Sequence, residues 1–146
     1  RDRLNLQAMQ QASGFLVGRH DYERFSDKRA EDKSTIVVVE KAEIAPTGDL
    51  IIFRIAASHF LWKMVRRVVG CIVEVGRGNL APEDLEAFVA SAPLPAKLKQ
   101  FSIAEHTAPA SGLFLERVIY DEDEDVDSLH PAIPVHHKDS KTQNFN

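Results

Sequence analysis

The sequence contains very little cysteine and no long hydrophobic run. Cys71 is the single cysteine among 146 residues, so an internal disulfide is excluded and a reducing compartment, cytoplasm or nucleus, is expected. No run of 18 apolar residues occurs, and we expect neither a membrane span nor a membrane partner. The first residues, RDRLNLQ, lack both an initiator methionine and an apolar signal region. We therefore expect the chain to belong to a longer protein.

Several sequence patterns of common chemistries are also missing. No cysteine pair and no H-E-x-x-H segment is present, so the sequence predicts no metal site. The segment GRGN does not open a helix after a strand, which excludes a phosphate-binding loop for a nucleotide cofactor. No serine–histidine–aspartate arrangement is indicated. Zinc enzymes, P-loop enzymes and serine hydrolases are therefore not favoured.

Negative charge is concentrated at the C-terminal end of the chain. The formal net charge is −4, from 18 lysines and arginines against 22 acids. Residues 121–146 hold seven of these acids and two lysines, which leaves residues 1–120 with a balance of +1. We divide the chain into a body at 1–120 and an acidic, flexible tail at 121–146. A near-neutral body with local arginine clusters is compatible with a nucleic-acid partner.

The longest stretch of helical spacing runs from Ser58 to Leu80. Its apolar residues recur every third or fourth position and predict one long amphipathic helix. Ser58 is the expected N-cap, and Gly76 or Gly78 is the expected C-terminal stop. The polar side of this helix is expected to carry Lys63, Arg67 and Glu74.

Arg66 does not belong to that polar side. On a helical wheel it falls at the edge of the apolar arc, one turn after Trp62 and one turn before Gly70. A guanidinium at such a border should be half-buried and directed along the border, which makes Arg66 a candidate functional residue. Cys71, in the same helix, is expected to be a small packed thiol rather than a reactive one.

Shorter patterns predict the other elements of an α+β fold. An antiparallel sheet with helices packed on one face follows from their order along the chain. The expected elements are a helix at 4–17, two strands at 35–44 and 50–57 joined by a turn at 45–49, a helix at 82–91 and a third strand at 113–120. The helix at 82–91 is expected to start at Pro82 and to pack through Leu85, Phe88 and Val89.

A charged segment at 18–34 shows no clear period. It is either a solvated surface loop or a loop that contacts phosphate groups, and both interpretations stay open. Tyr22 and Phe25 are expected to anchor it to the body. Asp21, in its aromatic and basic context, is either a cap paired with a neighbouring arginine or a catalytic carboxylate. The cationic residues of the segment are Arg19, His20, Arg24, Lys28, Arg29 and Lys33.

Four segments of the chain have motif-like sequences. They are 18–25 (GRHDYERF), 60–70 (FLWKMVRRVVG), 74–78 (EVGRG) and 108–120 (APASGLFLERVIY). In this order they resemble the C-terminal half of the tRNA pseudouridine synthase A family, with its patterns G-x-H-D-F-x-x-F, F-L-x-x-M-V-R-x-I-V-G, E-V-G-x-G and A-P-A-x-G-L-x-L-x-x-V-x-Y. Tyr22 stands where the family usually has phenylalanine.

The resemblance implies that residues 1–120 are one half of a two-domain pseudouridine synthase fold. The enzyme would isomerise uridine to pseudouridine in the anticodon stem-loop region of tRNA, without cofactor or metal. The nucleophilic aspartate of the family lies in a G-R-T-D-x-G-V-H-A segment of the N-terminal half, and nothing in this sequence matches it. Arg66 matches the arginine that pairs with this aspartate. Leu113 matches an apolar residue that lines the base pocket, and Gly112 would let the backbone approach closely.

The implied partners are tRNA, an N-terminal catalytic domain and a second copy of the chain in a homodimer. Arg19 and His20 are the candidate tRNA contacts within the charged segment. Because the nucleophile is missing, we expect this chain alone to be inactive. An alternative is a stand-alone, non-catalytic RNA-binding or scaffold module that has lost its catalytic half.

Overall fold

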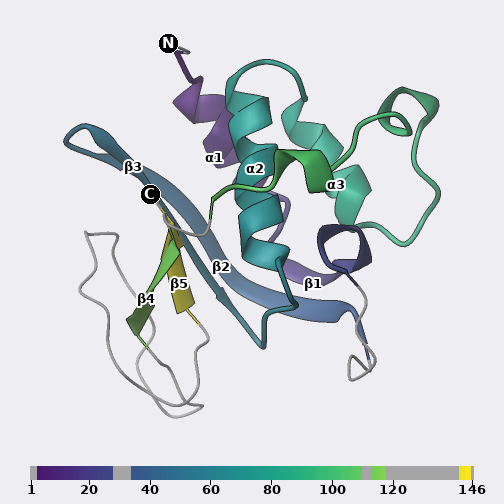
Figure 1. Ribbon diagram of the computed structural model, residues 1–146, viewed down its shortest axis with the longest axis horizontal. Helices are drawn as coiled ribbons and strands as arrows, with labels where there is room; N and C mark the ends of the chain where they lie inside the picture. Colours follow the sequence, from purple (N-terminus) through teal and green to yellow (C-terminus); the bar gives the residue numbers. More distant parts are fainter. Residues whose placement is uncertain (1–2, 28–33, 110–112, 118–141, 146) are drawn as a thin grey trace.

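The computed structural model describes residues 3–27, 34–109, 113–117 and 142–145. These residues form an α+β domain in which three α-helices pack on one face of an antiparallel sheet (Figure 1). The fold class expected from the sequence is confirmed. Gly112 and most of the predicted acidic tail lie outside the described residues.

Within the described residues, the sheet has five strands in the order β1-β2-β3-β5-β4, and every neighbouring pair is antiparallel. The expected hairpin is confirmed as β2 and β3, which pair up to Thr47 opposite Leu50. Its turn is shorter than predicted because β2 continues through Pro46, and Gly48 closes it with a φ of 60°. The strands are β1 (Gly18–Asp21), β2 (Ile36–Thr47), β3 (Leu50–Ala57), β4 (Leu113–Arg117) and β5 (Thr142–Phe145).

Two of these strands were not expected from the sequence. β1 lies inside the charged segment that we had predicted to be irregular, and it pairs with β2 through Arg19 opposite Val38. β5 lies within the predicted tail and pairs with both β3 and β4, with Asn144 opposite Arg54. Each strand has only four residues, too few for an alternating pattern to show, and each forms because a partner strand lies beside it.

The three helices are α1 (Leu6–Gly14), α2 (Met64–Gly76) and α3 (Pro82–Val89). All three were predicted, but all three are shorter than expected and the predicted N-cap of α2 is wrong. Ser58 donates its N–H to the carbonyl of Val38 at 2.8 Å, and its hydroxyl accepts the N–H of Val38 at 3.1 Å. These bonds extend the sheet pairing by one residue and hold Ser58 outside the helix. The C-terminal end is as predicted, since α2 ends at Gly76 and Gly78 has a left-handed φ of 88°.

The core lies between the sheet and the three helices. The predicted stripe of α3 is confirmed, and so is the packed state of Cys71. Burial, together with the charge of Glu74, raises the pKa of the Cys71 thiol to about 12. Tyr22 and Phe25 are both fully buried and anchor the charged segment as expected. The core residues include Val37, Val39, Phe53 and Ile55 from the sheet, Met9 and Ala12 from α1, Val68 and Ile72 from α2, and Leu85 and Phe88 from α3.

None of the described helices is both long and apolar enough to cross a membrane. Three short 3-10 helices complete the described chain: η1 (Glu23–Phe25), η2 (Ala96–Leu98) and η3 (Ala104–His106). The connecting segment that carries η3 crosses α2 on the side away from the sheet (Figure 1).

Candidate functional site

Arg66 lies in the first turn of α2, because the helix begins only at Met64. Lys63 precedes the helix with a left-handed φ of 66°, and the N–H of Met64 bonds to the carbonyl of Leu61 at 3.1 Å. This tight turn connects the end of β3 to the helix. It places Arg66 near the N-terminal end of a helix whose remaining turns are almost entirely buried.

Arg66 and Ala108 are joined by hydrogen bonds in both directions. The Nε of Arg66 donates to the carbonyl oxygen of Ala108 at 2.8 Å, and the N–H of Ala108 donates to the carbonyl oxygen of Arg66 at 3.0 Å. The Arg66 side chain is half-buried, as the helical wheel predicted. In the described part of the chain, no acceptor takes a hydrogen bond from its two Nη atoms. The guanidinium is therefore fixed at Nε, while its terminal nitrogens can still bind an anion.

Arg67 and Glu74 do not lie on a solvated helix face, and this prediction is wrong. Each residue is only 6% exposed. The Nη1 of Arg67 pairs with Oδ1 of Asp27 at 3.0 Å, and the Nζ of Lys63 pairs with Oδ2 of Asp27 at 3.3 Å. Hydrogen bonding from Arg67, assisted by Lys63, holds the pKa of Asp27 below its usual range. The segment after η1 packs beside α2 and covers the side on which Arg67 lies.

Glu74 stabilises the C-terminal end of α2. Its carboxylate accepts hydrogen bonds from Arg77 at 2.7 Å and from the side chain of Asn79 at 2.8 Å. Burial by itself would raise the pKa of Glu74, but these bonds outweigh it and the pKa is lowered. Arg67 and Glu74 are thus structural residues, and Arg66 is the arginine of α2 in which neither terminal nitrogen has a partner among the described contacts.

Arg19 and His20 do not join Arg66 through any hydrogen bond, ion pair or ring contact among the described residues. Successive residues of a strand point to opposite faces, so the two side chains of β1 leave the sheet on different sides. Arg19 is exposed. The Nε2 of His20 lies 2.9 Å from the carbonyl oxygen of Val17, and its ring lies edge-on to Tyr22. His20 therefore holds the turn between α1 and β1.

Arg24 contacts protein carbonyls, which neither interpretation of the charged segment had anticipated. Its guanidinium donates to the carbonyl oxygens of Ala87, Phe88, Ala90 and Ala92 at 2.8–3.3 Å. These carbonyls lie at and beyond the C-terminal end of α3, where a helix leaves its last carbonyls without the regular intrahelical partners.

Asp21 is a cap, as one of the two interpretations had it, but among the described residues its partner is Thr35 and not a neighbouring arginine. Its Oδ1 accepts the N–H of Glu23 at 3.0 Å and the hydroxyl of Thr35 at 2.7 Å. The carboxylate thus stabilises the start of η1 and ties the charged segment to the residue before β2. No contact among the described residues gives it a catalytic role.

Leu113, the predicted pocket residue, begins β4. It lies five residues after Ala108, so it is within about 18 Å of the carbonyl that holds Arg66. Gly112 falls outside the described residues, and the positions of both relative to a bound base remain predictions.

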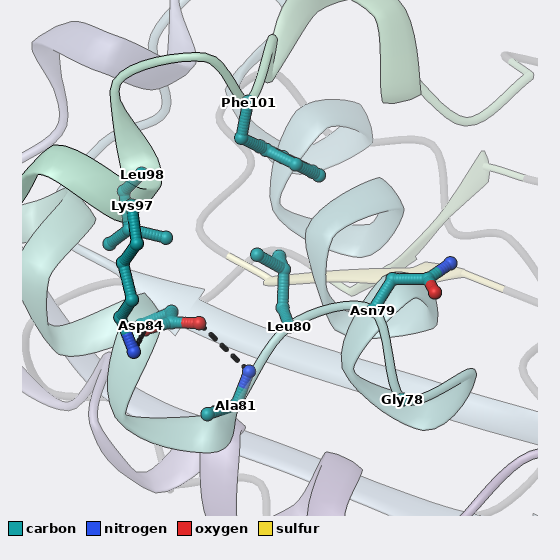
Figure 2. Close-up of a pocket in the computed structure, with 8 residues that line it drawn as sticks. All are labelled: Gly78, Asn79, Leu80, Ala81, Asp84, Lys97, Leu98 and Phe101. Atoms are coloured by element: carbon teal, nitrogen blue, oxygen red, sulfur yellow. Dashed lines mark hydrogen bonds and ion pairs between the residues drawn. The ribbon is translucent and has the colours of Figure 1, made fainter.

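A pocket of about 430 Å³ lies at the other end of α2 (Figure 2). Leu80, Leu98 and Phe101 form its apolar lining, and Asp84 pairs with Lys97 at 3.3 Å on its rim. A helix of 13 residues is about 20 Å long, so this pocket is separate from Arg66. Among the described residues, no group of histidine, cysteine and acidic side chains is arranged to hold a metal ion.

Fold and site together define an α+β domain with one anchored, anion-accepting arginine at the border of its central helix. Residues 12–121 match the sequence model of the tRNA pseudouridine synthase family, and the chain belongs to that family.

The chain is 38% identical over 118 residues to the tRNA pseudouridine synthase A of Bacillus licheniformis, which covers 81% of this chain and 45% of that protein. It is 39% identical over 119 residues to the tRNA pseudouridine synthase A of an Exiguobacterium species, covering 82% and 46%. The protein of the same name from Borreliella afzelii is 34% identical over 119 residues, with the same coverage. The chain spans less than half the length of the curated relatives it matches.

Proposed function

We propose that this chain is the C-terminal domain of an enzyme that converts uridine to pseudouridine in tRNA, and that Arg66 pairs with its nucleophilic aspartate. The aspartate would come from an N-terminal domain, because no segment of this sequence matches the G-R-T-D-x-G-V-H-A pattern. The observation that carries the proposal is the state of Arg66, whose Nε is bound by Ala108 while its Nη atoms have no acceptor among the described residues. Family membership supports the same reaction.

The reaction places a particular demand on the arginine. A target base in a stem-loop must leave its stack before its glycosidic bond can be reached, and the pocket then closes over it. A carboxylate in such a pocket is desolvated and tends to take up a proton. A guanidinium that presents two parallel donors keeps the carboxylate ionised and oriented for attack. Arg66 supplies those donors from a fixed position.

The isomerisation itself needs no added atoms. The bond between N1 of uracil and C1′ of the ribose breaks, the base turns, and a bond between C5 and C1′ forms. The C5 hydrogen leaves as a proton and N1 gains one, so atoms and charge balance. In this scheme Leu113 lines the base pocket, Gly112 gives the backbone close access, and the exposed Arg19, beside His20, contacts the tRNA backbone.

The test uses tRNA that carries tritium at C5 of uridine. We expect no tritium release from this chain alone. The reading frame should continue upstream of Arg1 with a G-R-T-D-like motif, and we expect the protein translated from it to release tritium. Release by the purified chain alone would contradict the proposal. A longer protein that binds tRNA tightly but releases no tritium would instead favour the non-catalytic RNA-binding module.

A further inference from the structure

Gly70 lies in the middle of α2 and faces the backbone of the connecting segment. A Cβ atom built on Gly70 would lie 1.4 Å from the carbonyl oxygen of His106 and 2.6 Å from its carbonyl carbon. Both are backbone atoms, so no change of rotamer removes the overlap. Any side chain at this position must push the segment away from the helix. Residues 104–108, which include η3, are called the strap below.

The strap is also braced by contacts that do not involve Gly70. The N–H of His106 bonds to the carbonyl of Ile103 at 3.0 Å, and its Nδ1 lies 2.8 Å from the carbonyl oxygen of Ser102. Its ring stacks on Phe101, with ring centres 4.4 Å apart and planes 12° from parallel. Phe101 in turn contacts the fully buried Phe88 at 5.8 Å. The strap is therefore a braced element with a defined distance from α2.

The strap contacts α2 at two points one turn apart. His106 lies against Gly70, and Ala108 exchanges hydrogen bonds with Arg66. Residues i and i+4 of a helix lie on one face, so both contacts are on the same side of α2. A Cβ at position 70 would require a shift of about 2 Å to reach normal contact distance, and a shift of that size breaks a 2.8 Å hydrogen bond.

We propose that Gly70 is a positioning residue for Arg66. Its missing side chain lets the strap lie on α2, and the strap then fixes the Nε of Arg66 and the direction of its terminal nitrogens. Without the Ala108 carbonyl, the long arginine side chain regains rotamer freedom. The consequence for catalysis rests on the proposed role of Arg66, whereas the contact itself can be tested in this chain.

The first test measures solvent exchange of the Arg66 Nε–H by ¹⁵N NMR of this chain. We expect Gly70→Ala to speed this exchange by about tenfold, the change expected when a hydrogen bond from a charged group is lost. Gly76→Ala is the matched control in the same helix, because the atoms nearest to its Cβ would be side-chain atoms of Met9 and Leu4, not backbone atoms. Gly14→Ala is a second control with no atom within 4 Å. Unchanged exchange in Gly70→Ala, or an equal increase in Gly76→Ala, overturns the proposal.

A second pair of variants covers the case in which Gly70→Ala does not fold. His106→Ala removes the ring that stacks on Phe101 and leaves Gly70 intact, so it should also speed the exchange of the Arg66 Nε–H. His106→Phe keeps the stacking and should restore slow exchange. Wild-type exchange in His106→Ala counts against a role of the strap, whereas fast exchange in both variants supports it and assigns the bracing to the Nδ1 contact with Ser102.

The catalytic consequence is tested in the longer enzyme. Gly70→Ala should lower kcat by about tenfold, because the hydrogen bond that orients the Arg66 guanidinium is lost. KM for tRNA should stay within about twofold, because most contacts with the tRNA do not involve Arg66. Unchanged kcat in Gly70→Ala, with Arg66→Ala inactive, overturns the positioning role and leaves the proposed function intact. Full activity of Arg66→Ala contradicts the proposed function, while the NMR result in this chain still decides the contact.

Discussion

Arg66 and Ala108 lie 42 residues apart in the sequence and exchange two hydrogen bonds in the structure. The bond at Nε uses the donor of the guanidinium that lies nearest the main chain. The two terminal nitrogens stay available, and together they can bind a carboxylate through two parallel hydrogen bonds. The backbone of the strap thus orients the arginine without neutralising it.

Replacement of Arg66 should abolish catalysis in the longer enzyme. We expect Arg66→Ala to lower kcat by at least about a hundredfold, because an ion pair to the nucleophile is lost from a closed pocket. Affinity for tRNA should fall only modestly. Arg66→Lys should remain strongly impaired, since one ammonium cannot bind the Ala108 carbonyl and present two parallel donors. Tritium release and filter binding measure the two effects, and wild-type turnover by Arg66→Ala would contradict this role.

Replacement of the neighbouring Arg67 should affect stability instead. The sequence placed Arg67 on the polar side of the helix, but Arg67 is buried and pairs with Asp27. We expect Arg67→Ala to lower the free energy of unfolding by about 2 kcal/mol, because it leaves a cavity and removes the packing of the alkyl chain. Arg67→Met, which keeps that packing, should lose less. Urea denaturation provides the measurement, and equal stability of wild type and Arg67→Ala would be the contrary result.

Arg24 should contribute to stability rather than to tRNA binding. Its guanidinium supplies donors to four carbonyls around the end of α3. We expect Arg24→Gln to lower the free energy of unfolding by about 2 kcal/mol, the scale of charged hydrogen bonds. Arg24→Lys should recover part of the loss. If tRNA affinity falls in Arg24→Lys with stability unchanged, the structural role is refuted.

Stability should decrease at alkaline pH because of the buried thiol. The pKa of Cys71 is raised from its ordinary value near 9.0 to about 12, so between these values the unfolded chain loses the thiol proton and the folded chain keeps it. The unfolded state then binds fewer protons, and stability falls with rising pH by up to about 1.4 kcal/mol per pH unit. Thermal melting between pH 8 and 10.5 should show a shallower decrease for Cys71→Ala than for wild type. Parallel curves would show that the thiol ionises equally in both states.

Binding of tRNA should depend on the exposed Arg19. If Arg19 contacts a phosphate, Arg19→Ala should weaken tRNA binding and reduce the slope of log affinity against log salt by about 1. Melting temperature should be unchanged. Lys99→Ala, also exposed but near η2, is the matched control and should leave the slope unaltered. Identical slopes for wild type and Arg19→Ala would remove Arg19 from the tRNA contacts.

Structural features that depend on residues close together in the sequence were predictable from the sequence. The hairpin of β2 and β3, the start of α3 at Pro82 and the end of α2 at Gly76 all follow from residues within a few positions of each other. Apolar spacing identified the packed side of α3, and the general tendency of a free cysteine to be buried predicted the packed thiol of Cys71. The half-buried border position of Arg66 also followed from the helical period alone.

The starts and partners of these elements were not predictable in the same way. Ser58 looked like an N-cap, but pairing with Val38, twenty residues earlier, holds it in the sheet. The helical wheel assumed that only the apolar side of α2 is packed, and it therefore placed Arg67 on the polar side. In the structure, the segment that carries Asp27 covers Arg67. Arg24 looked like a loop cation, although it caps a helix more than sixty residues away.

The sequence by itself determined the fold class, most of the core and the identity of the candidate arginine, because helical and strand periods are local properties of the chain. Only the tertiary structure decided what holds that arginine. Its partner is a backbone carbonyl of Ala108, which has no side-chain signature, and its approach depends on the absence of a side chain at Gly70. Such contacts exist only once distant segments have packed together, so no local pattern encodes them.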